Sequence, residues 1–243
     1  RGRQMMNLHQ RVKLALRGRR ARRRGDPEIA RLAALVGRGR RSIDIGANRG
    51  VYTYWLARLS QVVEAFEPNP ILASRLESTG LSGVTVHRGA LSDSAGEARL
   101  NVPHHRRGGL DDPGGRLDAL PDGVSGDCFA TAVCPLDAFA FDKVDFIKID
   151  VEGHEEKVIA GGWATIIANT PTLLVELEDR HNPGCVGRVA ARFADIGYQM
   201  RFLDDDLWHD LDSLADNQIG PSGRYINNFL LVPARRADEF TGG

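Results

Sequence analysis

The sequence predicts an α/β protein with a mostly parallel, doubly wound sheet flanked by helices. Short apolar runs with the length of buried strands alternate with segments whose apolar residues recur every three to four positions, as in helices. The run over 144–149, Val-Asp-Phe-Ile-Lys-Ile, is almost continuously apolar, which is typical of a central parallel strand. Strand–helix alternation over most of the chain favours a parallel sheet over a sandwich or a bundle.

Seven runs fit strands of this sheet: 42–45, 61–66, 84–87, 144–149, 172–177, 199–203 and 227–232. Helical spacing follows the first strand, after a glycine turn, and the second, after Glu67-Pro68-Asn69-Pro70. The predicted helices are 51–59, 70–79, 155–160 and 186–196. An earlier helix is predicted to start at Asp26-Pro27-Glu28.

Residues 97–102 and 131–136 also have strand-like patterning, and they flank a segment rich in Gly, Pro and Asp. This segment, 103–127, is long for a connection without secondary structure in a compact domain. We therefore interpret it as a lid or an insertion. Length and composition fit one domain over 26–243, preceded by a basic leader over 1–25.

Composition excludes several classes of protein. Hydrophobic content of 42% and charge of 26% are ordinary for a globular protein, and no apolar run approaches the ~18–20 residues of a membrane span. Cys128, Cys134 and Cys185 have no CxxC spacing, which argues against a zinc site and a disulfide framework. We expect a reducing, cytoplasmic environment.

The leader is strongly basic. Residues 1–24 hold ten of the 32 Lys and Arg residues and none of the 32 Asp and Glu residues, so the rest of the chain has a net charge of about −10. Met5, Leu8, Val12 and Leu16 fall near helical spacing, which suggests an amphipathic helix or a tail. We expect a solvated helix, a subunit contact or a peripheral contact with the inner face of an anionic membrane. Nucleic acid is not expected, because no base-stacking aromatic residue accompanies the charge.

A glycine turn between the first strand and its helix is the strongest local signal. Gly46-Ala47-Asn48-Arg49-Gly50 opens a helix, and such a turn can offer backbone N–H groups to a ligand. Asp44 precedes it and would repel phosphate, so a ligand with positive charge or hydroxyls is expected; S-adenosylmethionine (SAM) is one. Glu67 ends the second strand about 20 residues later, where a carboxylate can accept ribose hydroxyls.

Two rival phosphate sites fit the turn less well. The second and third glycines of the dinucleotide pattern G-x-G-x-x-G are replaced here by Asn48 and Val51, which disfavours NAD. The Lys-Ser/Thr end of a P-loop is absent from the turn.

Acids also gather after two later strands. Asp150, Glu152, His154 and Glu155 crowd one strand-to-helix turn, and Lys148 before them needs an acidic partner or access to the sheet end. We interpret Asp150 as an active-site residue, with Glu152 or His154 near the substrate; helix capping is the alternative.

The next strand ends in Glu176-Leu-Glu-Asp-Arg-His181. Its acids and His181 could hold a metal or orient a hydroxyl, or they could line a solvated loop mouth.

Five motifs occur in order at 43–50, 65–70, 89–93, 146–155 and 173–178, and their sequence and spacing resemble those of the FkbM family of SAM-dependent methyltransferases. The resemblance covers about 41–233, and 146–155, Phe-Ile-Lys-Ile-Asp-Val-Glu-Gly-His-Glu, is its most specific part. It implies a Rossmann-like class I methyltransferase fold, with seven strands here. It also implies O-methylation of hydroxyls on sugars, glycans, polyketides or related natural products.

The resemblance also implies roles for single residues. The turn would surround the methionine part of SAM with Asp44, Gly46, Ala47, Asn48 and Gly50. Glu67 would hold the ribose, and the adenine would lie near Ala90, Leu91, Ser92 and Asp93. Asp150 would sit between cofactor and acceptor, whereas His154 occupies a position that varies in the family. Substrate choice would reside in 103–127, which lies outside the motifs.

An alkyl hydroxyl is a poor nucleophile, so a base or a metal should assist its deprotonation. Asp150, Glu152, His154 and Glu176 are the candidate catalytic residues, acting directly or through a divalent cation. Two other readings remain at this point: a non-catalytic binding protein with a SAM-type fold, and an NAD-dependent oxidoreductase.

Overall fold

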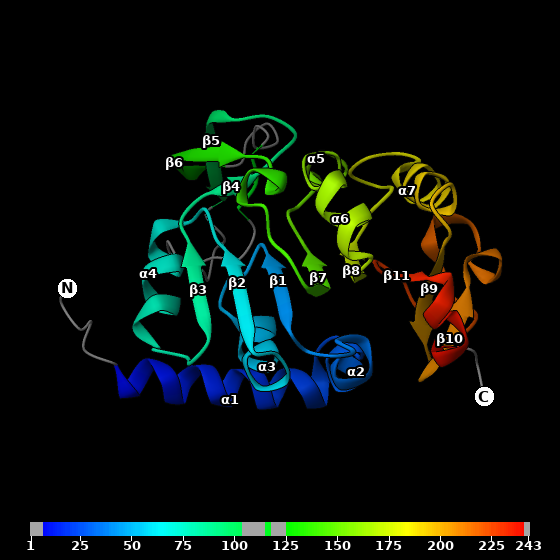
Figure 1. Cartoon of the computed structure of the whole chain (residues 1–243), viewed down its shortest axis with the longest axis horizontal. Coiled ribbons are helices and arrows are strands. Elements are labelled where there is room, and N and C mark those ends of the chain that lie inside the picture. Colours follow the sequence, from blue (N-terminus) through cyan, green and yellow to red (C-terminus); the bar gives the residue numbers. More distant parts are fainter. Residues whose placement is uncertain (1–6, 104–114, 118–124, 241–243) are drawn as a thin grey trace.

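The computed structural model describes residues 7–103, 115–117 and 125–240 (Figure 1). Its central sheet contains β1 (Arg41–Ile45), β2 (Val62–Phe66), β3 (Val84–His87), β7 (Val144–Ile149), β8 (Thr172–Glu176), β9 (Tyr198–Asp204), β10 (Leu207–Asp210) and β11 (Asn228–Pro233). The strand order is β10-β9-β11-β8-β7-β1-β2-β3. The five neighbouring strands β3, β2, β1, β7 and β8 are parallel to one another. The strand β11 runs antiparallel to both β8 and β9. The predicted α/β class with a mostly parallel sheet is confirmed.

The sheet has eight strands instead of the predicted seven, because β10 was missed. It pairs with β9 across a two-residue turn at Asp205 and Asp206, whose φ angles are +45° and +65°. Positive φ at both positions is the geometry of a tight hairpin whose twist matches that of its strands. Three successive aspartates at 204–206 do not carry the Asn-Gly or Asp-Gly pattern that identifies such turns in a sequence.

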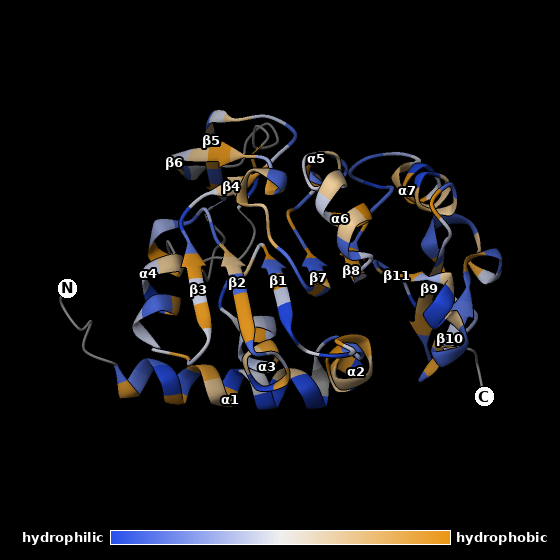
Figure 2. Cartoon of the chain, in the orientation of Figure 1, coloured by the Kyte–Doolittle hydropathy of each residue, from blue (hydrophilic) through white to orange (hydrophobic). Residues whose placement is uncertain are grey.

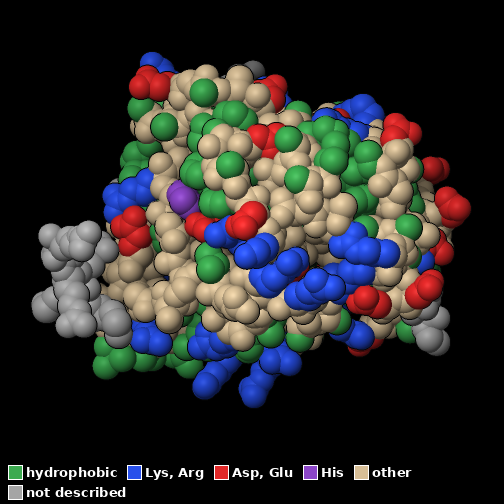
Figure 3. All heavy atoms as spheres, in the orientation of Figure 1, with side chains coloured by type: hydrophobic (Ala, Val, Ile, Leu, Met, Phe, Trp, Pro, Cys, Tyr) green, Lys and Arg blue, Asp and Glu red, His purple; other side chains and the backbone are tan. Residues whose placement is uncertain are grey.

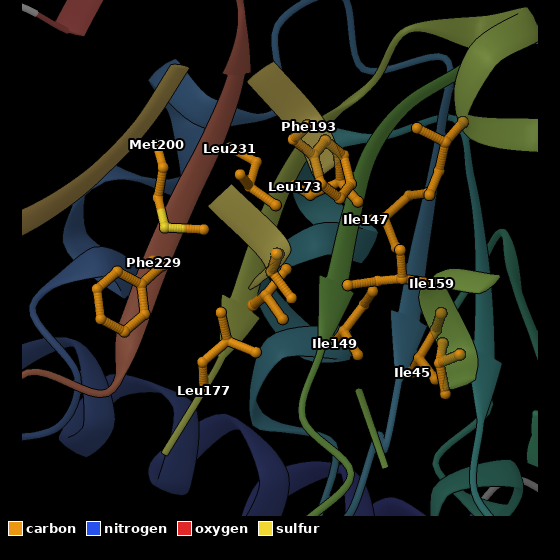
Figure 4. Close-up of a cluster of buried hydrophobic side chains, with 14 of the residues drawn as sticks. Ile45, Ile147, Ile149, Ile159, Leu173, Leu177, Phe193, Met200, Phe229 and Leu231 are labelled. Atoms are coloured by element: carbon orange, nitrogen blue, oxygen red, sulfur yellow. The ribbon is translucent and has the colours of Figure 1, made fainter. Parts of the chain in front are cut away.

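Helices cover both faces of the sheet: α2 (Glu28–Leu35), α3 (Val51–Leu59) and α4 (Pro70–Ser78) follow the leader, and α5 (Glu155–Gly161), α6 (Trp163–Asn169) and α7 (Cys185–Ala194) come later. Side chains alternate across a strand, so β7 gives Phe146 to the α2–α3 face and Ile147 to the α5–α7 face. Figure 4 shows the second cluster, where Ile147 and Leu173 from the strands meet Ile159 of α5 and Phe193 of α7.

The leader is a helix, α1 (Leu8–Arg24), that packs on the domain. Leu14 is buried with Tyr54 and Leu76, and the indole N–H of Trp55 donates to the carbonyl of Gly18 at 3.0 Å. A Cβ at Gly18 would lie 2.5 Å from the ring of Tyr54, so the glycine permits this close crossing. Met5 lies outside the described residues. Helix α2 starts at Glu28 with Pro27 as its N-cap, and Asp26 instead accepts a hydrogen bond from Tyr52.

Within the part of the chain that the structure describes, no helix is long and apolar enough to cross a membrane.

A second sheet lies beyond the carboxyl ends of β1–β3 (Figure 1). It contains β4 (Ala90–Leu91), β5 (Gly96–Pro103) and β6 (Gly126–Cys134) in the order β4-β6-β5. Of the proposed lid, 104–114 and 118–124 lie outside the described residues. Arg116 is held beside β5 by two backbone hydrogen bonds to Asn101, of 2.8 and 2.9 Å. Short 3₁₀ helices complete the chain: η1 (Leu136–Phe139), η2 (Leu211–Ser213), η3 (Asp216–Gln218) and η4 (Ala234–Phe240).

Candidate active site

A cleft opens between the two sheets, at the carboxyl ends of the parallel strands. The central sheet lines it with residues that end β1, β2, β7 and β8, among them Glu67, Asp150 and Glu176. Leu91 of β4 and Leu100 of β5 line the opposite side, together with Gly115 and Leu117 of the proposed lid. One wall is therefore polar and charged, and the other is apolar.

The glycine turn is closed by hydrogen bonds within the protein. The amides of Gly46 and Ala47 both donate to the carbonyl of Phe66, at 3.0 and 2.9 Å, and the amide of Asn48 donates to Glu67 at 2.6 Å. These N–H groups are consequently not offered to a ligand, which corrects that sequence expectation. The turn instead locks the end of β1 to the end of β2.

Two glycines of the turn serve close packing. Gly46 has φ +81°, and a Cβ there would lie 1.8 Å from the carbonyl oxygen of Asp150. Gly50 has φ +77°, and its Cβ would lie 2.6 Å from Leu76 of α4, so this residue faces the helices behind the turn.

Asp44 is buried below the turn. Its Oδ2 accepts a 2.5 Å hydrogen bond from the hydroxyl of Thr53, and burial raises the pKa of the carboxyl to about 6. With Ala47 and Asn48 it lines a second hollow, next to the cleft, to which Lys148 and Tyr52 also contribute. Gly46, Asn48 and Asp150 belong to both spaces.

Glu67 is the buried carboxylate at the end of β2. Its two oxygens accept from the amides of Asn48, at 2.6 Å, and Asn69, at 2.8 Å. Burial nevertheless raises the pKa of Glu67 to about 7. A carboxylate has about four acceptor positions, so two remain for hydroxyl donors in the cleft.

The expected adenine region divides into two parts. Ala90 and Leu91 line the cleft, next to Phe66 and Leu72. Ser92 is engaged elsewhere: its hydroxyl and Nε2 of His154 are 3.0 Å apart, and Asp93 next to it is exposed. The pair between Ser92 and His154 joins β4 to the start of α5.

Asp150 and Glu176 form a pair of carboxyl groups in the polar wall. Nζ of Lys148, on a side chain only 1% exposed, lies 3.9 Å from Asp150 and donates to Asn228 at 3.0 Å. Glu176 accepts a short hydrogen bond from Asn227 and shares one with Asp150. Burial and the neighbouring Asp150 charge raise the pKa of Glu176 well above its ordinary value.

The turn after β7 presents Glu152 to the same cleft. Glu152 and Gly153 have φ angles of +55° and +99°, and Glu155 holds this turn by accepting from the amides of Val151 and Gly153 at 3.2 and 3.0 Å. Burial and Asp150 also raise the pKa of Glu152. Glu155 thus caps the turn, whereas Glu152 faces the site.

No group of three or more His, Cys, Asp and Glu side chains within the described ranges could hold a metal ion. Glu178 is paired with Arg180 at 2.6 Å and with His181 at 2.9 Å. The divalent cation considered from the sequence therefore finds no support in this geometry.

Sequence reasoning missed Asn227 and Asn228. They stand at the start of β11, and because this strand is antiparallel its beginning lies at the same edge as the carboxyl ends of β7 and β8. Two adjacent amides before an apolar strand were the available signal, but the direction of the strand is not visible in the sequence.

The profile of the Methyltransferase FkbM domain matches residues 44–207, which is more than half of the chain. The chain belongs to the FkbM methyltransferase family. This family is one of SAM-dependent methyltransferases, which confirms the resemblance drawn from the five motifs. No curated protein matches the sequence.

A solved structure from the same family shows the same fold. The crystal structure of Methyltransferase FkbM from Methylobacillus flagellatus KT is similar with a TM-score of 0.52 and 17% identity, over 93% of this chain and 58% of that one. This chain thus spans little more than half of that protein. A SAM-dependent O-methyltransferase from Thermotoga maritima has a TM-score of 0.44 and 14% identity, over 84% of this chain and 63% of that one. A putative methyltransferase from Streptococcus mutans, crystallised with SAH, has a TM-score of 0.44 and 9% identity, over 82% and 92%.

Proposed function

We propose that this FkbM methyltransferase transfers the methyl group of SAM to a hydroxyl of a sugar, a glycan or a natural product. The observation that supports the proposal is one cleft that joins two carboxyl sites: Glu67 at the end of β2, and the Asp150–Glu176 pair at the ends of β7 and β8. The first suits the ribose of a nucleoside, and the second suits the hydroxyl that reacts.

The cleft fits SAM in the chemistry of its donors and acceptors. Glu67 would accept from the ribose hydroxyls, and Phe66, Ala90 and Leu91 would contact the adenine. Asp44 and Lys148, in the adjoining hollow, would face the charged ends of the methionine part. When bound, SAM supplies a methyl group already activated by the sulfonium.

The remaining task of the chain is to orient a hydroxyl and to take its proton. Asp150 is partly exposed in the cleft, and Lys148 balances its negative charge. Glu176, with its raised pKa, stays protonated near neutral pH and donates its hydrogen bond to Asp150. Asp150 would then accept the proton of the acceptor hydroxyl.

The lining of the cleft favours an acceptor with several hydroxyls. Asp150, Glu152 and Glu176 gather at one end, and carboxyl groups accept hydrogen bonds from hydroxyl donors.

We place the reaction in the cytoplasm, because all three cysteines are free thiols.

Calorimetry with SAH and NAD in parallel tests the cofactor. We expect SAH to bind at micromolar to sub-millimolar concentration and NAD not to bind. NAD binding without SAH binding would favour an oxidoreductase. If neither SAH nor NAD binds, a non-catalytic binding protein would be favoured. Either result would overturn the proposal.

Transfer of a radiolabelled methyl group to panels of sugars, polyketides and amines tests the acceptor. Asp150→Asn should lower kcat on the order of 10²- to 10⁴-fold, because the acceptor of the proton is lost, while SAH affinity is kept. Asp205→Asn, in the exposed hairpin turn, is the matched control and should retain full activity. Unchanged turnover in Asp150→Asn would remove Asp150 from the mechanism, and labelling of amines alone would refute O-methylation.

A further inference from the structure

We propose that the outer face of α1 docks on an anionic lipid bilayer. This surface consists of Leu8, Val12 and Leu16, followed along the helix by Arg19, Arg20 and Arg23. It lies before the region that matches the FkbM domain, so it is a property of this chain and does not depend on the reaction proposed above.

The inner face of α1 is fixed to the domain, which decides what its outer face presents. Leu14 is 3% exposed, Gly18 packs on Tyr54, and the amide of Asn7 donates to the carbonyl of Ser78 at 2.9 Å. The guanidinium carbon of Arg22 lies over the ring of Trp55, 5.0 Å from its centroid. The helix therefore cannot turn its other apolar residues inward without breaking these contacts.

Three large apolar side chains on the outer face are exposed: Leu8 is 72% exposed, Val12 49% and Leu16 59%. They recur every four residues, which places them in one stripe along the helix. In Figure 2, apolar and polar patches alternate along α1. Half of the six exposed large hydrophobic residues among those described lie on this one helix.

The same face becomes basic toward the C-terminal end of α1. Arg19 and Arg23 fall within about a quarter turn of the stripe at 3.6 residues per turn, and Leu16 lines one shallow groove with Arg19, Arg20 and Arg23. All three arginines are exposed, and the sequence of α1 contains no acid. Figure 3 shows hydrophobic side chains along the left part of the lower margin and basic ones along its middle, where α1 runs.

Charge complementarity selects the bilayer as the occupant. Helices that lie in a membrane interface insert their apolar side chains among the acyl chains and hold their arginines at the level of the lipid phosphates. A symmetric contact between two copies would place this basic face against itself. The rest of the chain carries a net charge of about −10, so an anionic surface attracts α1 and repels the remainder, which orients the molecule.

Sedimentation of the full chain with vesicles tests the proposal, using phosphatidylcholine alone and phosphatidylcholine mixed with phosphatidylserine. We expect binding to the mixed vesicles that weakens with salt, and little binding to the neutral ones. Arg19→Gln/Arg20→Gln/Arg23→Gln should lower the affinity on the order of a hundredfold. The charge-matched control, Arg38→Gln/Arg99→Gln/Lys157→Gln, changes exposed residues elsewhere and should leave binding within a few fold.

The apolar stripe is tested separately. Leu8→Ser/Val12→Ser/Leu16→Ser should lower vesicle binding at least tenfold, whereas Ile167→Ser/Leu207→Ser, also on exposed apolar residues, should not. Circular dichroism and melting temperature verify that each variant is folded. Equal binding by the native protein and the stripe variant would overturn the proposal, as would no binding to any vesicle. A concentration-dependent dimer that the stripe variant abolishes, without vesicle binding, would assign the face to a second copy instead.

Discussion

The pKa of Glu67 makes a quantitative prediction about cofactor binding. Ribose hydroxyls need the ionised carboxylate as their acceptor, and the pKa of about 7 means that this form is scarce below neutral pH. The ionised fraction rises from about one eleventh at about pH 6 to about ten elevenths at about pH 8. The affinity for SAH should therefore rise about tenfold over this interval, or about 1.4 kcal/mol.

Isothermal titration calorimetry with SAH at three pH values measures this change, and Glu67→Gln identifies its source. A neutral amide loses a charge-assisted acceptor worth about 1.5–3 kcal/mol, so affinity at about pH 8 should fall about 10- to 150-fold. The variant should also lose most of the pH dependence. A residual change of about twofold is expected from Asp44, whose pKa is about 6.

Glu64→Gln provides the matched control on the same strand. Glu64 is buried but pairs with His87 at 2.9 Å and Arg41 at 3.4 Å, away from the cleft. Its substitution should leave the tenfold pH effect on SAH affinity intact. If the native protein and Glu67→Gln show the same pH slope, Glu67 is not the group that controls binding, and the reasoning from its burial is refuted.

Two further predictions concern stability. Glu28 is 3% exposed, its Oε2 has no hydrogen-bond partner among the residues that the structure describes, and burial raises its pKa from 4.5 to about 7. Because the pKa of Glu28 is raised by folding, the stability that its protonated form contributes is fully present below the pKa of the unfolded chain, 4.5. This contribution is lost as the pH rises through the pKa in the folded protein, about 7. The free energy of unfolding of Glu28→Gln, measured with urea, should therefore gain about 3 kcal/mol relative to the native protein between about pH 4 and about pH 8. If the difference in unfolding free energy between Glu28→Gln and the native protein did not change with pH, this prediction would be contradicted. For Gly46→Ala, the Cβ would meet the carbonyl of Asp150, so we expect a loss of at least about 3 kcal/mol or no folded protein. Gly197 also has positive φ (+76°), but a Cβ there would meet no described atom within 4 Å. Gly197→Ala should therefore lose only about 1–2 kcal/mol, and equal losses at both sites would rule out the steric explanation.

The site was predictable where strand ends carry unusual residues. Glu67, Asp150 and Glu176 each follow or end an apolar run, and parallel strands bring their carboxyl ends to one edge. That rule alone assembles the polar wall of the cleft from segments more than 100 residues apart.

The apolar wall was not predictable in the same way. Residues 97–102 and 131–136 have strand-like patterning, but nothing in that alternation says that β5 and β6 form a separate sheet over the cleft. Partner choice between strands depends on contacts remote in sequence. The strand β10 was missed for a local reason: its tight turn depends on the left-handed conformation of Asp205 and Asp206, which the residue types do not indicate.

The fold class, the family and the acids at or near the strand ends could be predicted from the sequence, because they depend on local pattern and on motif spacing. The surroundings of these acids became known from the folded structure. Burial raises the pKa of Glu67 and Glu176, Lys148 balances Asp150, and the direction of β11 brings Asn227 and Asn228 to the same edge. Three amides of the glycine turn, those of Gly46, Ala47 and Asn48, also donate within the chain, because the end of β2 accepts their hydrogen bonds. Desolvation and hydrogen-bond partners are properties of the surroundings in space, and the order of residues does not specify them.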